Sequence, residues 1–290
     1  MNIEKTLIQK VALLLIRERC DEAVAKKVAE KIITIHANHL THGKVKKHDE
    51  FFDTLFKALA PYEREIKAML HRIWDEERRI ILANLKKLKK AHVRKDTIDD
   101  ILYPKNEFIK KLSKETKALY LQLIKERGQY YLSQFKPEIA FDVTNPRVVE
   151  WLDSYIPEFS KNLEAVNASD ITKVLSEGMK AGETIPELMA RINETFETWD
   201  RYRAEIISRT ESSRASNQAW LEGAKQSWVV EKKVWLAAPG CCEECDILDG
   251  TVVELDGDFF EADYGTGDSP PLHPNCRCSI AAEIEETSNG

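Results

Sequence analysis

Residues 240–250 read GCCEECDILDG and residues 273–278 read HPNCRC, so five of the chain's six cysteines lie within the 38 residues 241–278. A Cys-x-x-Cys turn brings two thiolates close enough to share one metal ion, and a second pair from a distant segment can complete a tetrahedron. Because the amino-terminal sequence MNIEKTLIQK is not typical of an export signal, we expect the clustered thiols to bind a metal rather than to form disulfides. This stretch therefore predicts a zinc site in a segment with little apolar core of its own.

More side chains are available than a tetrahedral zinc site requires. The candidate ligands are Cys242, Cys245, His273, Cys276 and Cys278, with Cys241 a less favoured sixth. Cys276 and Cys278 are two residues apart, so in a strand they point to the same face and can bind together, which leaves His273 outside the ligand set. In the alternative arrangement, His273 binds together with only one of these two cysteines.

A zinc site closed by four protein ligands is structural, whereas catalysis requires an open coordination position and a general base. Acidic residues beside the first thiols leave the open arrangement as an alternative: Glu243, Glu244, Asp246 and Asp249. The thiol-rich donor set favours structural zinc, and Asp249-Gly250 is typical of a hairpin turn. The chain has no phosphate-binding glycine loop, nucleophile elbow or dinucleotide fingerprint. We therefore expect no enzyme, no catalytic residues and no organic cofactor.

Upstream of the cysteines, the sequence is typical of helices. Only four of the 11 glycines precede residue 222, and the apolar residues recur at helical spacing. Asn145 and Pro146 fit the N-cap and the first position of a helix. We expect helices at about 2–17, 21–40, 62–92, 106–135, from 146 onward, 168–179, 185–196 and 199–225. Short strands are expected within 229–238, 250–255 and 276–284.

Together these patterns predict a mainly α fold with a small C-terminal α+β module. An extended helical assembly is followed by short antiparallel strands around the Cys/His metal site. No apolar run approaches the roughly 20 residues that a membrane helix needs. The protein is therefore expected in the cytoplasm of the cell that makes it, without a membrane partner.

The charge is unevenly distributed along the chain. The net charge is −6, but residues 240–290 hold 13 acidic residues and only Arg277 as a base, which gives −12 for that end and +6 for the rest. The basic run at 86–95 predicts at most a weak electrostatic contact with DNA phosphates. His36, His39 and His42 lack the spacing of a metal motif and are expected to be surface residues.

A polar motif, SRTESSRASN at 208–217, lies within the last long predicted helix. One interpretation is a solvated helix face, on which Glu211 and Arg214 pair at i, i+3. In the other, Arg209, Glu211 and Asn217 form hydrogen bonds that hold the Cys-rich hairpins against this helix.

Five segments, in this order, resemble the phage Mu F-like head morphogenesis family of minor capsid proteins. They are TNPRVVEWL, VLSEGMKAGETIPELMARI, SRTESSRASNQAW, KVWLAAPGCCEECDILDG and PPLHPNCRC, and they span roughly residues 140–282. The doubled Cys241-Cys242 departs from the family pattern and leaves the first ligand ambiguous. The resemblance says less about residues 1–128.

The resemblance implies a minor head protein of a phage or prophage, present in the virion in the head interior or portal region and in the host cytoplasm during assembly. Its implied partners are the portal protein and other head or scaffold proteins, with packaged DNA and DNA ejection as further implied associations. Residues 129–290 would form the Mu F-like domain, with 229–282 its metal-stapled end, and residues 1–128 a helical region that contacts the portal or other partners. The alternative function is a zinc-dependent nuclease or other hydrolase that acts on phage DNA.

Overall fold

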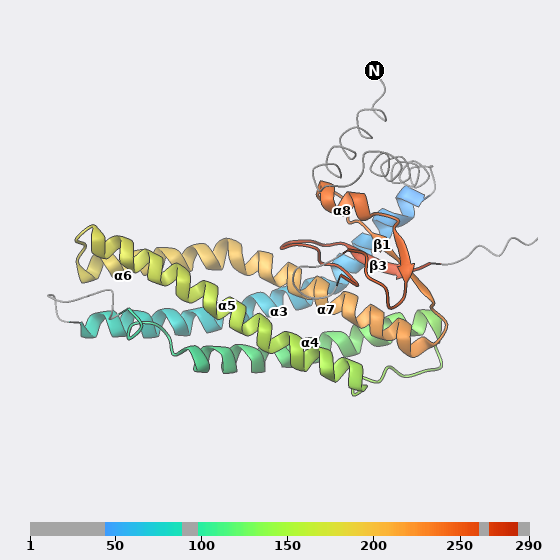
Figure 1. Ribbon diagram of the computed structural model, residues 1–290, viewed down its shortest axis with the longest axis horizontal. Helices are drawn as coiled ribbons and strands as arrows, with labels where there is room; N and C mark the ends of the chain where they lie inside the picture. The colour runs from blue at the N-terminus through green and yellow to red at the C-terminus, as the bar shows by residue number, and fades with distance from the viewer. Residues whose placement is uncertain (1–43, 89–97, 261–266, 284–290) are drawn as a thin grey trace, which may run out of the picture. The chain divides into compact units, whose positions relative to one another are not determined.

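The computed structural model describes residues 44–88, 98–260 and 267–283, and these residues form long helices followed by a small sheet (Figure 1). The helices are α3 (Lys44–Lys87), α4 (Lys105–Phe135), α5 (Pro146–Lys180), α6 (Ile185–Thr198), the π-helical turn η2 (Trp199–Arg203), α7 (Ala204–Ser227) and the short α8 (Glu243–Leu248). The strands are β1 (Lys232–Leu236), β2 (Val252–Glu254) and β3 (Ser279–Ala282). The predicted fold class, mainly α with a small antiparallel C-terminal module, is confirmed.

The chain divides into two compact units. One comprises residues 59–229 and the short segment 273–276, and the other combines the start of α3 with residues 230–272 and the chain from Arg277 onward. The predicted domain boundary at residue 129 was placed from the sequence segments that resemble the family, and it stays a prediction. In the structure, α4 runs through that position. The helices predicted at 2–17 and 21–40, the three histidines at 36–42 and most of the basic run at 86–95 lie outside the described residues.

Apolar residues at helical spacing build the core of the helical unit. The predicted positions Ile66, Leu70, Ile73, Ile81 and Leu85 are each at most 3% exposed. They pack in one cluster with residues of α4, α5, α6 and η2, among them Phe108, Leu112, Ile171, Leu175 and Phe196. The helix predicted at 62–92 therefore exists, but it begins earlier, at Lys44, and ends at Lys87.

The start of α5 follows the sequence prediction. The Asn145 side chain accepts a hydrogen bond from the Arg147 N–H at 3.1 Å, and Pro146 occupies the first turn. The prediction of a separate helix at 168–179 was wrong, because α5 continues without a break to Lys180. Its buried stripe continues from Ile156 through Leu163 to Ile171, so core packing maintains the helix across Pro157.

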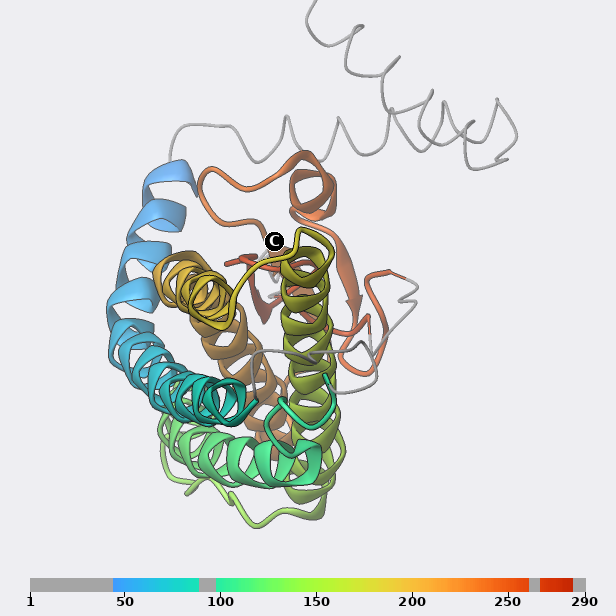
Figure 2. The same ribbon diagram turned by 90° about the vertical axis from the view of Figure 1, so that its left-hand side faces the viewer.

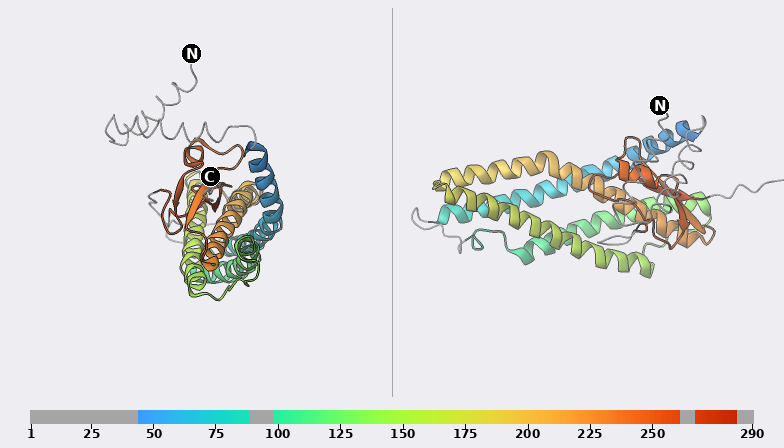
Figure 3. Two further views of the ribbon diagram at one scale, coloured as in Figure 1. Left: turned by 90° about the vertical axis from the view of Figure 1, so that its right-hand side faces the viewer. Right: turned by 45° about the horizontal axis from the view of Figure 1, so that its top comes forward.

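The helix α7 lies in the middle of the helical unit, with α3, α4 and α5 around it (Figures 2 and 3). From Thr210 to Ser227 it is buried at every position except Arg214 and Lys225, which are half-buried. A Cβ atom added to Gly223 would lie 3.2 Å from the backbone oxygen of Gly128, so α4 and α7 approach closely there. The interpretation of 208–217 as a solvated helix face was therefore wrong.

The strands form an antiparallel sheet in the order β2-β1-β3, with Lys233 opposite Val253 and Trp235 opposite Ile280. The turn predicted at Asp249-Gly250 is present, and Gly250 adopts a φ of +74° that favours glycine. The Asp249 carboxylate accepts a hydrogen bond from the Ala237 N–H at 2.8 Å, so this acid holds the turn against the end of β1. No helix among the described residues has the length and hydropathy to span a membrane.

Candidate metal centre

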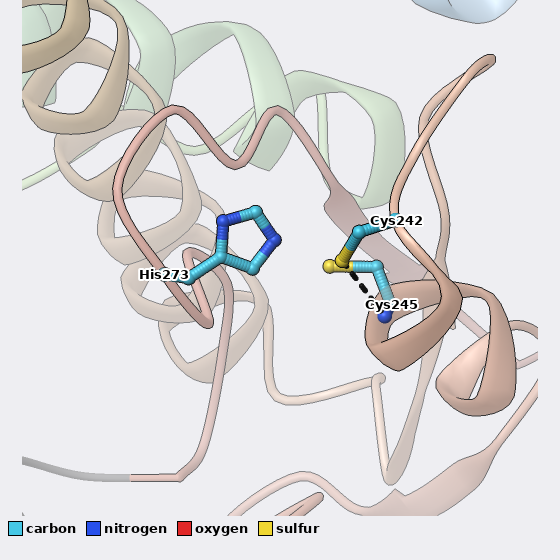
Figure 4. Close-up of side chains that lie close together, drawn as sticks. All are labelled: Cys242, Cys245 and His273. Atoms are coloured by element: carbon cyan, nitrogen blue, oxygen red, sulfur yellow. Dashed lines mark hydrogen bonds between the residues drawn. The ribbon is translucent and has the colours of Figure 1, made fainter.

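All five predicted ligands fall within two clusters of potential metal-binding atoms. Cys242, Cys245 and His273 form one cluster, and Cys245, Cys276 and Cys278 form the other. Within each cluster the ligand atoms lie within 4.8 Å of one another. Figure 4 shows the first cluster, with the Cys245 side chain beside that of Cys242 and the His273 ring facing the two thiols. Cys245 belongs to both clusters, and Cys241 belongs to neither.

The Cys-x-x-Cys pair is positioned by α8. Cys242 is the N-cap of this helix, and its Sγ accepts a hydrogen bond from the Cys245 N–H at 3.4 Å. This hydrogen bond fixes the position of the Cys242 sulfur beside Cys245, and thiolate sulfur is the form of cysteine that binds metals. Cys242 is exposed, whereas Cys245 is 1% exposed, so the pair extends from the protein surface to the interior.

His273 has the environment of a metal-binding imidazole. Its Nδ1 lies 2.8 Å from the Pro274 carbonyl oxygen. A carbonyl can only accept, so Nδ1 carries the hydrogen, and in the neutral imidazole Nε2 has a lone pair for a ligand bond. The turn is closed by a hydrogen bond from the Cys276 N–H to the His273 carbonyl at 3.1 Å. This geometry favours His273 as a ligand without excluding either cysteine that follows it.

Cys276 and Cys278 lie just before β3 and are 2% and 1% exposed. The Sγ of Cys278 accepts a hydrogen bond from the Ala238 N–H at 3.4 Å, which fixes it beside the end of β1. Both residues point to the buried side, as the two-residue spacing predicts. One cluster contains His273, and the other contains both Cys276 and Cys278. The structure is therefore compatible with a ligand set that includes His273 and with one that uses both cysteines instead.

The loop that carries His273 is fixed to α7 by Thr210. The Asn275 N–H donates to Thr210 Oγ1 at 2.8 Å, and Asn275 has a φ of +64°, a conformation that asparagine tolerates better than most residues. Arg209 instead pairs with Glu205, one turn earlier on the same helix, at 2.6 Å. Thr210, the middle residue of the Arg-Thr-Glu motif, therefore holds the segment 273–276 within the helical unit, whereas the bracing of the Cys-rich hairpins that was expected of Arg209 is replaced by its pair with Glu205.

Glu211 has a different role from the one expected. Its buried carboxylate accepts hydrogen bonds from the hydroxyls of Tyr120 on α4 and Tyr155 on α5. Burial raises the pKa of both tyrosines well above its ordinary value, and the charge of Glu211 raises it further. The Arg214 guanidinium lies 5.1 Å from the centre of the Tyr155 ring. This cluster connects three helices within the core and was not found from the sequence, because its tyrosines are 91 and 56 residues from Glu211.

Asn217, the third residue expected to hold the hairpins, donates through its side-chain amide to Ser213 Oγ on the same helix at 3.4 Å.

A second buried acid lies on α3. Burial raises the pKa of Glu77 to about 8, against a hydrogen bond from the Asn167 amide at 2.9 Å that lowers it.

The donor set fits a metal ion that prefers sulfur, such as zinc. Thiolate sulfur and imidazole nitrogen are the ligands that zinc prefers in structural sites. Hydrogen bonds to the backbone orient Cys242, His273 and Cys278. The cluster could therefore hold a metal ion. Bound there, zinc would supply folding free energy to a small sheet, which has few buried apolar residues of its own.

Residues 169–281 match the family described as "Phage Mu protein F like protein". Over these residues the chain is similar to that family. The matched region runs from the second half of α5 to β3 and contains α7 and all five candidate ligands, whereas the quoted segment at 144–152 lies before it.

The chain is also similar to "Uncharacterized protein YqbB" of Bacillus subtilis (strain 168), with 24% identity over 196 residues. That similarity covers 63% of this chain and 64% of the relative, which is just under two thirds of the relative's length. No solved structure gives a significant match.

Proposed function

We propose that this chain is a minor head protein of a tailed phage or prophage and that it acts in head morphogenesis. The observation that carries the proposal is the Mu F-like match over residues 169–281, which coincides with the buried helix α7 and the Cys/His clusters. The proposal places the protein in the virion, near the portal, and in the host cytoplasm while heads assemble.

The proposed role of the metal is structural. Zinc would be held by four of the residues Cys242, Cys245, His273, Cys276 and Cys278, and would perform no reaction. Three of these candidates, Cys245, Cys276 and Cys278, are almost completely buried, which suits a closed site. Asp249, an acidic candidate for catalysis, is engaged in the turn after α8 through its hydrogen bond from Ala237.

The proposed partners are the portal protein and other head or scaffold proteins. Several large apolar side chains are exposed on the helical unit, including Tyr202 at 63% and Val166 at 49%. Side chains of this kind can add apolar area to a contact with a partner, although the proposal of partners rests on the family match. Direct contact with packaged DNA is a weaker part of the proposal, because the excess basic charge before residue 240 is small.

The test uses particles of the phage or induced prophage that encodes the chain. We expect the protein in purified heads at few copies, at the portal vertex. Cys242→Ser should reduce infectious particles at least tenfold, because the metal module cannot close. The matched control, Cys241→Ser, removes the neighbouring thiol that belongs to neither cluster and should leave particle yield unchanged.

Two results would overturn the proposal. One is the absence of the protein from purified heads, together with normal head assembly when the gene is deleted. The other is metal-dependent DNA cleavage by the purified protein that is lost in Glu244→Gln or Asp246→Asn, which would establish the hydrolase alternative.

A further inference from the structure

The first turns of α3 have an aromatic face. His48 and Phe52 are in ring contact with centroids 4.9 Å apart, and Phe52 contacts Phe56 at 5.5 Å. Phe52 is 1% exposed and Leu55 is 5% exposed, so this face is buried. The segment from Lys44 to Ala58 belongs to the same compact unit as the sheet, α8 and Arg277, about 220 residues away in the sequence.

A cation–π contact joins this helix to the Cys-rich end. The guanidinium carbon of Arg277 lies 3.9 Å from the centre of the Phe56 ring. Arg277 is the residue between Cys276 and Cys278, two of the candidate ligands. A guanidinium over an aromatic face is attractive, and more so when both groups are partly removed from water.

The position of Arg277 between two ligands has a mechanical consequence. Both cysteines are buried and Arg277 is half-buried, the alternation expected of chain that leads into a strand. A metal bound to the flanking thiols restricts the backbone on each side of Arg277, so it also fixes the direction of the guanidinium. Without the metal, this segment loses that restraint and the contact with Phe56 becomes entropically more costly.

We propose that metal binding at the Cys/His site is coupled to docking of the first turns of α3, Lys44–Ala58, through the contact of Arg277 with Phe56. The inference rests on the metal site of the proposed function and adds a regulated element to it. Metal occupancy then controls the packing of the first part of α3. Because coupling free energies are reciprocal, loss of the Arg277–Phe56 contact must also weaken metal binding by the same factor.

The test is hydrogen exchange of the full chain, loaded with zinc and after removal of zinc by a strong chelator, with metal content measured in each sample. In the wild type, chelation should accelerate amide exchange within 48–58 at least tenfold. Phe56→Leu keeps an apolar side chain but removes the ring. In this variant, the amides within 48–58 should exchange rapidly even with zinc bound. The affinity of the variant for zinc should fall by a factor similar to the increase in exchange rate. Phe51→Leu is the matched control, because it removes one ring from the same helix, and Phe51 contacts the Phe52 ring at 5.2 Å.

Each outcome has a distinct meaning. Exchange within 48–58 that does not change while zinc leaves would overturn the coupling and leave the metal site intact. Identical behaviour of the Phe56 and Phe51 variants would also overturn it, since the effect would then belong to helix packing in general. A chain that takes up no zinc would overturn the metal site itself, and the coupling with it.

Discussion

The Thr210 hydroxyl offers a direct way to test whether α7 prepares the metal site. Thr210 is 8% exposed, donates to the Ile206 carbonyl at 2.7 Å and accepts from the Asn275 N–H at 2.8 Å. Thr210→Val keeps the shape of the side chain and removes the acceptor. The Asn275 N–H then loses its partner in a loop that carries both His273 and Cys276.

The expected cost follows from the loss of one hydrogen bond by a backbone donor. Asn275 is exposed, so water can replace the lost acceptor and the cost is the net contribution of one hydrogen bond, about 0.5–1.5 kcal/mol. If the loop must be ordered for His273 and Cys276 to reach the metal, this cost appears in metal binding, and 1.4 kcal/mol corresponds to a factor of ten. We expect Thr210→Val to lower zinc affinity by about 2-fold to 12-fold, measured by competition with a chromophoric chelator.

The control is Thr195→Val. Thr195 Oγ1 also donates to the carbonyl four residues earlier, that of Arg191 at 2.9 Å, but Thr195 lies on α6 rather than on the helix that holds the loop. This substitution should leave zinc affinity within twofold of the wild type. If Thr210→Val also stays within twofold, the loop is ordered by the metal alone and the assigned role of Thr210 is wrong.

The remaining expectations concern stability. Glu77 has a pKa of about 8 in the folded protein and 4.5 ordinarily, so the folded state binds more protons and loses stability as pH rises from about 4.5 to 8. In Glu77→Gln, the unfolding free energy should depend less on pH between about 4.5 and 8. An unchanged slope of unfolding free energy against pH would contradict the raised pKa of Glu77. Arg209→Ala should change the unfolding free energy by no more than about 0.5 kcal/mol, because Arg209 forms a partly exposed i, i+4 pair with Glu205. A loss above about 1.5 kcal/mol in urea unfolding would mean that Arg209 braces the Cys-rich end after all.

Local patterns in the sequence predicted a large part of the fold. Apolar residues at helical spacing located α3 and the core positions from Ile66 to Leu85, and Asn145-Pro146 marked the start of α5, because caps and amphipathic faces depend on residues close in sequence. The Cys-x-x-Cys spacing and the second cysteine pair also identified the residues that the structure brings into the two clusters.

Contacts between distant residues could not be predicted in this way. The polar sequence of α7 suggested a solvated face, but Glu211 is buried because tyrosines on two other helices donate to it. The pairing of Thr210 with Asn275, 65 residues apart, and that of Arg277 with Phe56 depend on the three-dimensional arrangement. No periodicity or spacing in the chain encodes these pairs, so a single sequence carries no signal for them.

Metal content is the most direct test of a Mu F-like region closed by zinc. The protein is purified without added metal and analysed for its elements, beside Cys245→Ser, which removes the one residue shared by both clusters, and Cys241→Ser, which removes a thiol of neither. We expect about one zinc per chain in the wild type and in Cys241→Ser, the stoichiometry of a single tetrahedral site, and almost none in Cys245→Ser. A wild-type protein that is fully folded with a zinc content near zero would contradict the metal centre.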